Sequence, residues 1–125
     1  MRAPTSATTT ARFLRGQQVT DTNGLAQFTT IVPGWYQGRA VHVHFKVRAD
    51  EAASGTLEFT SQLFFEDTLV DEVHARTPYA AKGQRTIRNA DDGIFRDGGD
   101  VLLLDLIGDA GSGYSASFDI GLRPA

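Results

Sequence analysis

The stretch Pro33-Gly-Trp-Tyr-Gln-Gly-Arg-Ala-Val-His-Val-His-Phe45 decides how the rest of the chain is interpreted. In its second half, apolar residues alternate with two histidines, His42 and His44. This period of two, in a run rich in β-branched and aromatic residues, predicts a strand with one buried face. Because successive side chains of a strand point to opposite faces, both histidines share one face, roughly 7 Å apart along the backbone.

Two neutral imidazoles at this spacing can bind one metal ion. The Pro-Gly dipeptide at 33–34 predicts a turn that carries Tyr36 back towards the histidines. A phenol bound to a hard trivalent cation loses its proton despite an unperturbed pKa of about 10, because the metal is the largest local charge. Tyr36, His42 and His44 are therefore a candidate N,N,O metal set, with Arg39 as a positive charge beside it. A half-exposed polar face without metal is the alternative.

Around this stretch, alternating and apolar runs predict an all-β, loop-rich β-sandwich of about six to seven strands. Besides the histidine strand, strands are expected at 13–19, 26–32, 56–65, 101–107 and 114–122, with a turn at 21–24. Residues 69–75 predict a short helix or an irregular segment, and His74 is expected on the surface. Residues 1–12 are expected to be a flexible polar lead-in, and residues 13–125 a single domain.

The length, net charge and composition of the sequence exclude several classes of protein. A chain of 125 residues with a net charge of −3 carries no basic footprint for nucleic acid. It contains no cysteine, which leaves His, Tyr, Asp and Glu as metal ligands. No apolar run has the length of a membrane span, and no signal-peptide pattern is visible. The compartment, including secretion of the parent protein, and the oligomeric state stay open.

An ordered series of motifs runs along the chain. The motifs are Phe13-Leu-Arg-Gly16, Thr20-Asp21, Gly24, Phe28-Thr-Thr-Ile31, Pro33-Gly-Trp-Tyr36, Gly38-Arg39, His42-Val-His44, Thr60-Ser-Gln-Leu-Phe-Phe65, Pro78-Tyr79, Asn89 and Asp91-Asp-Gly-Ile-Phe95. This series resembles the intradiol ring-cleavage dioxygenases, and it is most similar to their bacterial branch, which has a short link between tyrosine and arginine. The resemblance covers nearly all of the chain from Phe13 onwards.

The resemblance implies a non-haem Fe(III) enzyme that uses dioxygen to cleave catechol-type aromatics to cis,cis-muconate-type diacids. Carried over to this sequence, Tyr36 would be the ligand that leaves iron when catechol binds and then acts as a base. His42 and His44 would stay on the metal. Arg39 would stabilise negative charge that builds on the substrate, and Gln62 would contact the substrate. Tyr79 and Tyr114 match no ligand position of the family.

One part of the family pattern is missing. The family holds iron with two tyrosines, and the permanent one lies upstream in a motif resembling Trp-His-Cys-Asp-Ala-x-Gly-x-Tyr-Ser, whereas no tyrosine precedes Tyr36 here. We therefore expect the chain to be the C-terminal part of the domain, with an open sheet edge where N-terminal strands are absent. Losing a phenolate weakens Fe(III) binding relative to other ions. The chain alone is expected to be weakly active or inactive, and a version extended upstream to be active.

Two other classes of function fit the same residues. A metal-free β-sandwich binding module, derived from the dioxygenase fold, is favoured by the missing tyrosine. A structural or oligomerising sandwich would use Trp35 and the eight phenylalanines for packing and contacts. The intact set of Tyr36, Arg39, His42 and His44 argues against both.

Overall fold

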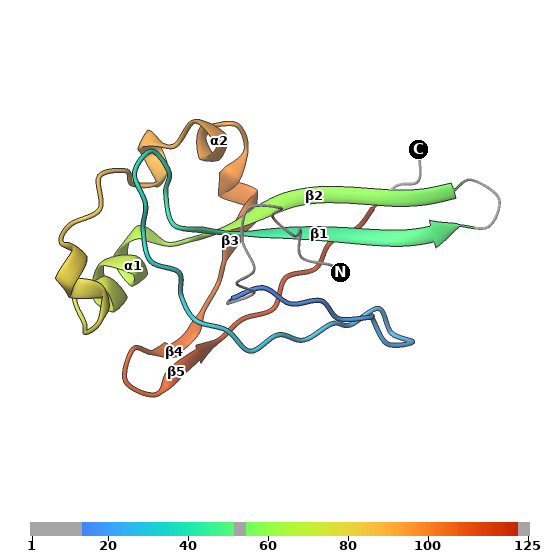
Figure 1. Ribbon diagram of the computed structural model, residues 1–125, viewed down its shortest axis with the longest axis horizontal. Coiled ribbons are helices and arrows are strands. Elements are labelled where there is room, and N and C mark those ends of the chain that lie inside the picture. Colours follow the sequence, from blue (N-terminus) through green and yellow to red (C-terminus); the bar gives the residue numbers. More distant parts are fainter. Residues whose placement is uncertain (1–13, 52–54, 123–125) are drawn as a thin grey trace. The chain divides into compact units, whose positions relative to one another are not determined.

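The computed structural model describes residues 14–51 and 55–122. Five strands, two α-helices and three 3₁₀-helices lie in these residues (Figure 1). The described residues divide into two compact units. Unit 1 holds residues 14–31, 44–51 and 55–61, and unit 2 holds residues 32–43 and 62–122. The expected lead-in at 1–12 lies outside the described residues, so the division into lead-in and domain stays a prediction.

The strands form two small sheets. The first has the order β1-β2-β3, and the second is the pair β4-β5. The strands are β1 (His42–Glu51), β2 (Gly55–Phe65), β3 (Leu103–Leu104), β4 (Ile107–Asp109) and β5 (Gly113–Ser115). β3 runs parallel to β2, with Phe64 opposite Leu103, whereas β4 and β5 are antiparallel. β1 begins at His42 and contains both histidines, so the predicted histidine strand is confirmed.

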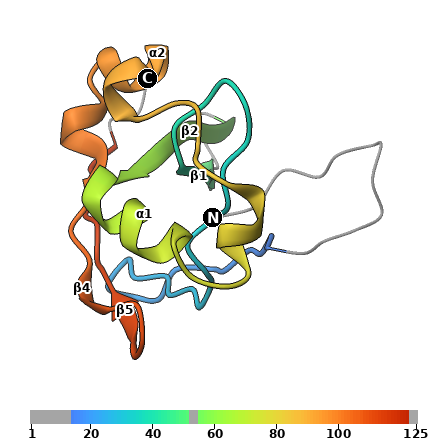
Figure 2. The ribbon, with the colours of Figure 1, turned by 90° about the vertical axis from the view of Figure 1, so that its left-hand side faces the viewer.

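The helices all belong to unit 2 (Figure 2). α1 (Asp67–His74) buries Val70, Val73 and His74, whose spacing of three and four places them on one helical face. Of the two alternatives left open for residues 69–75, a short helix or an irregular segment, the structure has the helix. The remaining helices are η1 (Tyr79–Lys82), η2 (Asn89–Asp91), α2 (Gly93–Arg96) and η3 (Gly99–Leu102). None of the helices in the described residues is long and apolar enough to cross a membrane.

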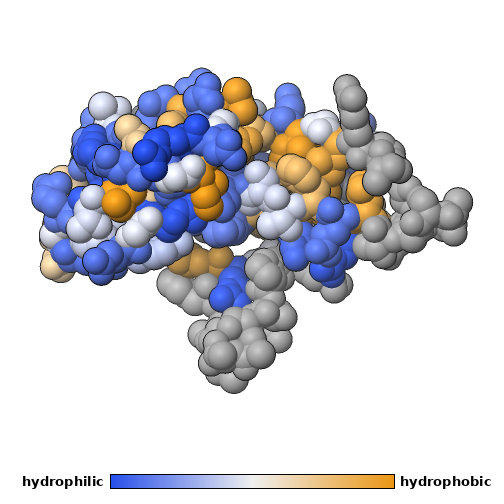
Figure 3. Space-filling view, turned by 90° about the horizontal axis from the view of Figure 1, so that it is seen from above, coloured by the Kyte–Doolittle hydropathy of each residue, from blue (hydrophilic) through white to orange (hydrophobic). Residues whose placement is uncertain are grey.

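Ion pairs tie α1 to the segment that follows it. Asp71 accepts hydrogen bonds from Arg85 Nη1 at 2.6 Å and from Arg88 Nη1 at 3.0 Å. Arg85 also contacts Asp67 Oδ1 at 3.1 Å, and its side chain is only 4% exposed. The hydrogen bonds from Arg88 and Arg85 lower the pKa of Asp71 to about 2. Hydrophilic side chains predominate over the helical part of the molecule (Figure 3).

Unit 2 has a core that connects the 32–43 stretch to the end of β2 and to α1. Val41, Phe65 and Val70 are buried at its centre. The partly buried residues packed against them are Val32, Trp35, Val43, Leu69, Leu104 and Leu106. Burying each large apolar side chain contributes about 1.5–3 kcal/mol. The segment that carries Tyr36 and Arg39 is thus anchored in the core on both sides, at Trp35 and at Val41.

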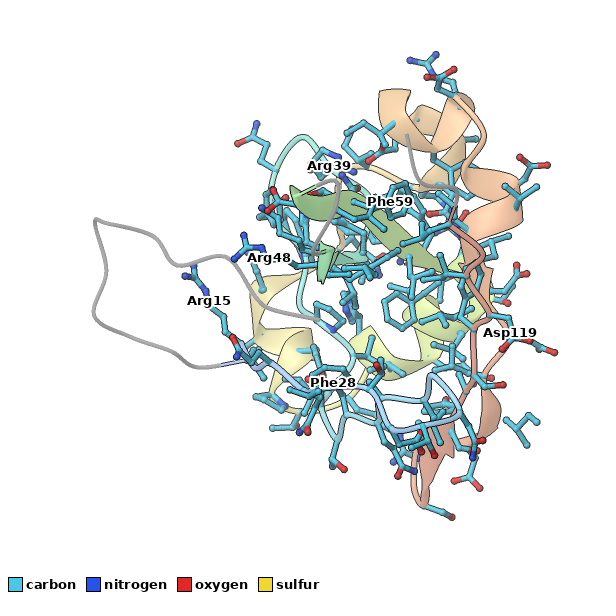
Figure 4. The ribbon with its side chains drawn as sticks, turned by 90° about the vertical axis from the view of Figure 1, so that its right-hand side faces the viewer. Arg15, Phe28, Arg39, Arg48, Phe59 and Asp119 are labelled. Atoms are coloured by element: carbon cyan, nitrogen blue, oxygen red, sulfur yellow. The ribbon has the colours of Figure 1, made fainter. Side chains whose placement is uncertain are left out.

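Unit 1 contains most of β1 and β2 and the turn at 21–24. Asp21 Oδ1 accepts hydrogen bonds from the backbone N–H groups of Asn23 and Leu25, both at 2.9 Å, and Gly24 has a φ of 78°. The turn predicted here is confirmed, and its fourth position requires glycine. In the strands, the rings of Phe45 and Phe59 have centroids 6.1 Å apart, and Figure 4 shows Phe59 on β2.

The β-rich class is confirmed, but a sandwich of six to seven strands is not, because five strands lie in the described residues. Residues 14–32 contain no strand, although strands were predicted at 13–19 and 26–32. The predicted strand at 101–107 is divided between η3, β3 and β4, and that at 114–122 ends with β5 at Ser115. Alternation describes only the side chains, whereas a strand also needs a neighbour with which its backbone pairs.

Candidate active site

The site begins at a turn that precedes β1. Gly38, at the turn formed with Gln37, has a φ of 94°, which other residues rarely adopt. No turn forms at 33–34, so the predicted position of the turn was wrong by four residues. Tyr36 nevertheless comes back towards the histidines, as was expected of the turn, because its Oη lies 3.4 Å from His42 Nε2. Tyr36 itself is 52% exposed.

The orientation of His42 directs its Nε2 towards Tyr36 and Arg39. His42 is buried, and its Nδ1 lies 2.6 Å from the carbonyl oxygen of Ala40. A carbonyl only accepts hydrogen bonds, so Nδ1 carries the proton in the neutral ring and Nε2 carries the lone pair. Metal-binding histidines very commonly have this arrangement, with the second nitrogen donating to a carbonyl or a carboxylate.

Arg39, which is labelled in Figure 4, contacts three other side chains. Its Nε donates to Asp92 Oδ2 at 2.8 Å, and its Nη2 donates to Gln62 Oε1 at 2.5 Å. Its Nη1 lies 3.3 Å from His42 Nε2. The guanidinium has only donors, so this contact also requires a lone pair on Nε2. The structure thus brings together four of the five predicted site residues, namely Tyr36, Arg39, His42 and Gln62, all in unit 2.

Asp92 was not predicted to take part in the site. Asp92 belongs to the motif Asp91-Asp-Gly-Ile-Phe95, and it caps α2 by accepting from the N–H groups of Ile94 and Phe95. Burial alone would raise the pKa of Asp92, but hydrogen bonds from Arg39, Phe95 and Ala40 outweigh it and lower the pKa to about 2. A capping signature is visible in the sequence, but nothing in it indicates a pairing with Arg39, 53 residues away.

His44 lies two residues beyond His42 in β1 and is exposed. Strand alternation places the two imidazoles on one face. His44 belongs to unit 1, whereas the cluster around Arg39 belongs to unit 2. The role of His44 as a ligand therefore stays a prediction.

The segment before Tyr36 is anchored by side chains from the helical region. Tyr79 Oη donates to the carbonyl of Val32 at 2.6 Å, and burial raises the pKa of Tyr79. His74 Nε2 lies 2.9 Å from the carbonyl of Pro33, and its ring stacks on Tyr79 with centroids 5.0 Å apart. The expectation that His74 is a surface residue was wrong, because it is only 8% exposed.

Trp35 completes this anchor. Its indole Nε1 donates to the carbonyl of Gly83 at 3.2 Å. Lys82 donates to the carbonyl of Trp35, and its Nζ lies 4.6 Å from the centre of the indole ring. Side chains of the helical region therefore hold the backbone on the N-terminal side of Tyr36, while the Tyr36 side chain is exposed.

The donor atoms of the cluster fit a hard trivalent metal. A phenol oxygen and an imidazole lone pair face each other, and phenolate is a hard donor of the kind that suits ferric iron. Among residues 14–51 and 55–122, no three His, Cys, Asp or Glu side chains are grouped to hold a metal ion.

The β-rich fold and this cluster place the chain among dioxygenases of known structure. An intradiol ring-cleavage dioxygenase from Tetranychus urticae is 31% identical with a TM-score of 0.69 over 79% of this chain and 47% of its own. A second dioxygenase is 30% identical with a TM-score of 0.74 over 86% of this chain and 51% of its own. The similarity of the chain to these two solved structures supports the family that its motifs predict, the intradiol ring-cleavage dioxygenases.

The chain spans about half the length of these two solved structures. No protein-family model matches the sequence. No curated protein matches it either.

Proposed function

We propose that the protein is a non-haem Fe(III)-dependent dioxygenase that cleaves catechol-type aromatics between the two hydroxyl-bearing carbons. Both atoms of dioxygen would enter the product, a cis,cis-muconate-type diacid. The observation that carries the proposal is the approach of Tyr36 Oη to His42 Nε2, at 3.4 Å, with the other ring nitrogen on a backbone carbonyl. The similarity of the chain to two solved dioxygenases supports the same class of reaction.

In this proposal, Tyr36, His42 and His44 hold the metal. When bound, Fe(III) supplies the Lewis acidity that ionises phenols and the redox chemistry that joins catechol to dioxygen. His42 Nε2 contributes its lone pair. Tyr36 Oη is exposed and can leave its position, so it would accept a proton from a hydroxyl of the incoming catechol.

Arg39 and Gln62 would act on the substrate. The guanidinium of Arg39 is held by Asp92 and Gln62 before any substrate binds. A positive charge that is already in place stabilises negative charge developing on the ring without having to reorganise. Gln62, through its amide, would contact the bound aromatic and keep Arg39 in position.

Oxygen uptake tests the proposal in this chain and in a version extended upstream to include a second tyrosine, both supplied with Fe(III). We expect the extended version to consume dioxygen with catechol and to yield the muconate-type diacid, with label from ¹⁸O₂ in both new carboxyl groups, whereas the chain alone should be weakly active or inactive. The variant Gln62→Ala should raise KM for catechol. The matched control Gln84→Ala, at an exposed glutamine outside the cluster, should not. Absence of oxygen uptake in both iron-loaded proteins would reject the proposal and favour a metal-free binding or structural module.

Three features beyond the site also remain proposals for the whole protein. These are a complete sandwich of six to seven strands, a single domain over residues 13–125, and a catechol-type substrate.

A further inference from the structure

Asp92 is a buried carboxylate with four donors. Its side chain has no exposed surface, and each of its oxygens accepts two hydrogen bonds. Oδ1 accepts from the N–H groups of Ile94 at 2.8 Å and Phe95 at 3.0 Å. Oδ2 accepts from Arg39 Nε and from the N–H group of Ala40, both at 2.8 Å. An ionised carboxylate has about four acceptor sites, so Asp92 is fully satisfied.

Capping α2 does not account for this arrangement. A helix N-cap needs one side-chain oxygen, and Ser, Thr or Asn supplies it as well as Asp. In Asp92, Oδ1 alone caps the helix, while Oδ2 is directed to the loop before β1. The second oxygen therefore serves Arg39 and Ala40.

The bond to Nε determines where the rest of the guanidinium lies. The group is planar, so fixing Nε on Asp92 and Nη2 on Gln62 defines its plane. Nη1 is then directed to His42, where it lies 3.3 Å from Nε2. Asp92 also holds the N–H of Ala40, and the carbonyl of Ala40 accepts from His42 Nδ1. One carboxylate thus orients both the cation and the imidazole of the site.

We propose that Asp92 is a positioning residue that orients Arg39, and through Ala40 also His42, for the reaction of this site. The proposal rests on the proposed function in so far as it concerns turnover. The orientation itself exists without iron or substrate. The low pKa of Asp92 keeps its negative charge over the pH range in which proteins are stable.

The first test uses the wild-type protein and needs no activity. In ¹⁵N-labelled protein, the Nε–H of Arg39 should exchange with water at least about tenfold more slowly than that of free arginine, because a charge-assisted hydrogen bond protects it. Exchange as fast as in free arginine would overturn the proposal, whatever the fate of any variant.

The second test compares two carboxylates. Asp92→Asn keeps the shape and a capping oxygen but loses the charge, and it should remove the protection of Arg39 Nε–H. Asp71→Asn is the matched control, because Asp71 also pairs with two arginines and has a pKa of about 2, yet lies outside the site. In this control, the exchange rate of the Arg39 Nε–H should be the same as in wild type. Equal protection in wild type and Asp92→Asn would overturn the proposal.

The third test is kinetic and uses the iron-loaded protein in the version extended upstream to include a second tyrosine. Asp92→Asn should lower kcat at least about tenfold per bound iron, with a smaller change in KM, because a preoriented cation acts mainly in the transition state. Unchanged kcat would overturn the positioning role. If the wild type itself shows no turnover, the proposed function fails, and the exchange measurements still decide whether Asp92 orients Arg39.

Discussion

Tyr36 and His42 face each other across the turn at Gly38, with Tyr36 Oη 3.4 Å from His42 Nε2. Their rings meet edge to face, with centroids 5.9 Å apart and an interplanar angle of 63°. The same nitrogen faces Arg39 Nη1 at 3.3 Å. The lone pair of His42, the phenol hydroxyl of Tyr36 and the cation of Arg39 therefore meet at His42 Nε2, and the predictions on the site depend on this arrangement.

Replacing Arg39 should lower turnover without removing bound iron. Arg39→Ala should keep bound iron but lower kcat about 100-fold, the effect of losing one preorganised group that stabilises developing charge. It should also destabilise the protein by about 3 kcal/mol, because Asp92 is left as an unpaired buried charge. Steady-state kinetics and urea unfolding measure the two effects.

The double variant Arg39→Ala/Asp92→Asn controls for this loss of stability. With both charges removed, part of the stability should return while kcat stays low. If the variant Arg39→Ala raised KM at unchanged kcat, Arg39 would be a binding residue only.

Acid should reveal the ion pair of Asp92. Its pKa is about 2 in the folded protein and 3.8 when unperturbed. A depressed carboxyl pKa contributes stability that is fully present above about pH 5 and is lost as the pH falls through 3.8 towards 2. The difference corresponds to about 2 kcal/mol.

Urea unfolding at a series of pH values from 6 to about 2 measures this contribution. The free energy of unfolding should fall less steeply with acid in Asp92→Asn than in wild type. Parallel curves for the two proteins would show that Asp92 is not held as an ionised partner of Arg39.

Two tyrosines should respond oppositely to loss of the hydroxyl group. Tyr79 Oη donates to the carbonyl of Val32, whereas the buried Oη of Tyr114 has no hydrogen-bond partner among the described residues. Tyr79→Phe should therefore cost about 1–2 kcal/mol, and Tyr114→Phe should cost nothing or stabilise the protein by up to about 1 kcal/mol. Thermal or denaturant unfolding of both variants tests this contrast. Equal losses in the two variants would contradict it.

The alternation from Val41 to Phe45 was sufficient to predict β1, because a period of two specifies a half-buried strand. The same signal failed at 26–32, because side-chain alternation does not say whether a partner strand is available. Likewise, Pro33-Gly34 is a common turn signal, yet the chain turns at Gly38, where a φ of 94° is needed. A turn signal describes only its own residues. Trp35 and Val41 are packed in the core, so the chain turns between these two residues rather than at 33–34.

Of the site, the residues close together in sequence could be predicted. Tyr36, Arg39 and His42 lie within seven residues, so local geometry brings them together. Gln62 was predicted from family motifs, and its contact with Arg39 spans 23 residues. Asp92 was missed because its partner lies 53 residues away, and charge pairing across that separation leaves no periodic signal in one sequence.

The central claim is that Tyr36 and His42 bind the same ferric ion. Iron analysis and visible absorbance of the protein supplied with Fe(III) test it most directly, since tyrosinate on ferric iron gives a charge-transfer colour. We expect wild type to be coloured, Tyr36→Phe to lose the band, and His42→Ala to lose bound iron. Tyr114→Phe, a control that removes a phenol outside the cluster, should keep both. Wild-type colour and iron content in both Tyr36→Phe and His42→Ala would contradict the account.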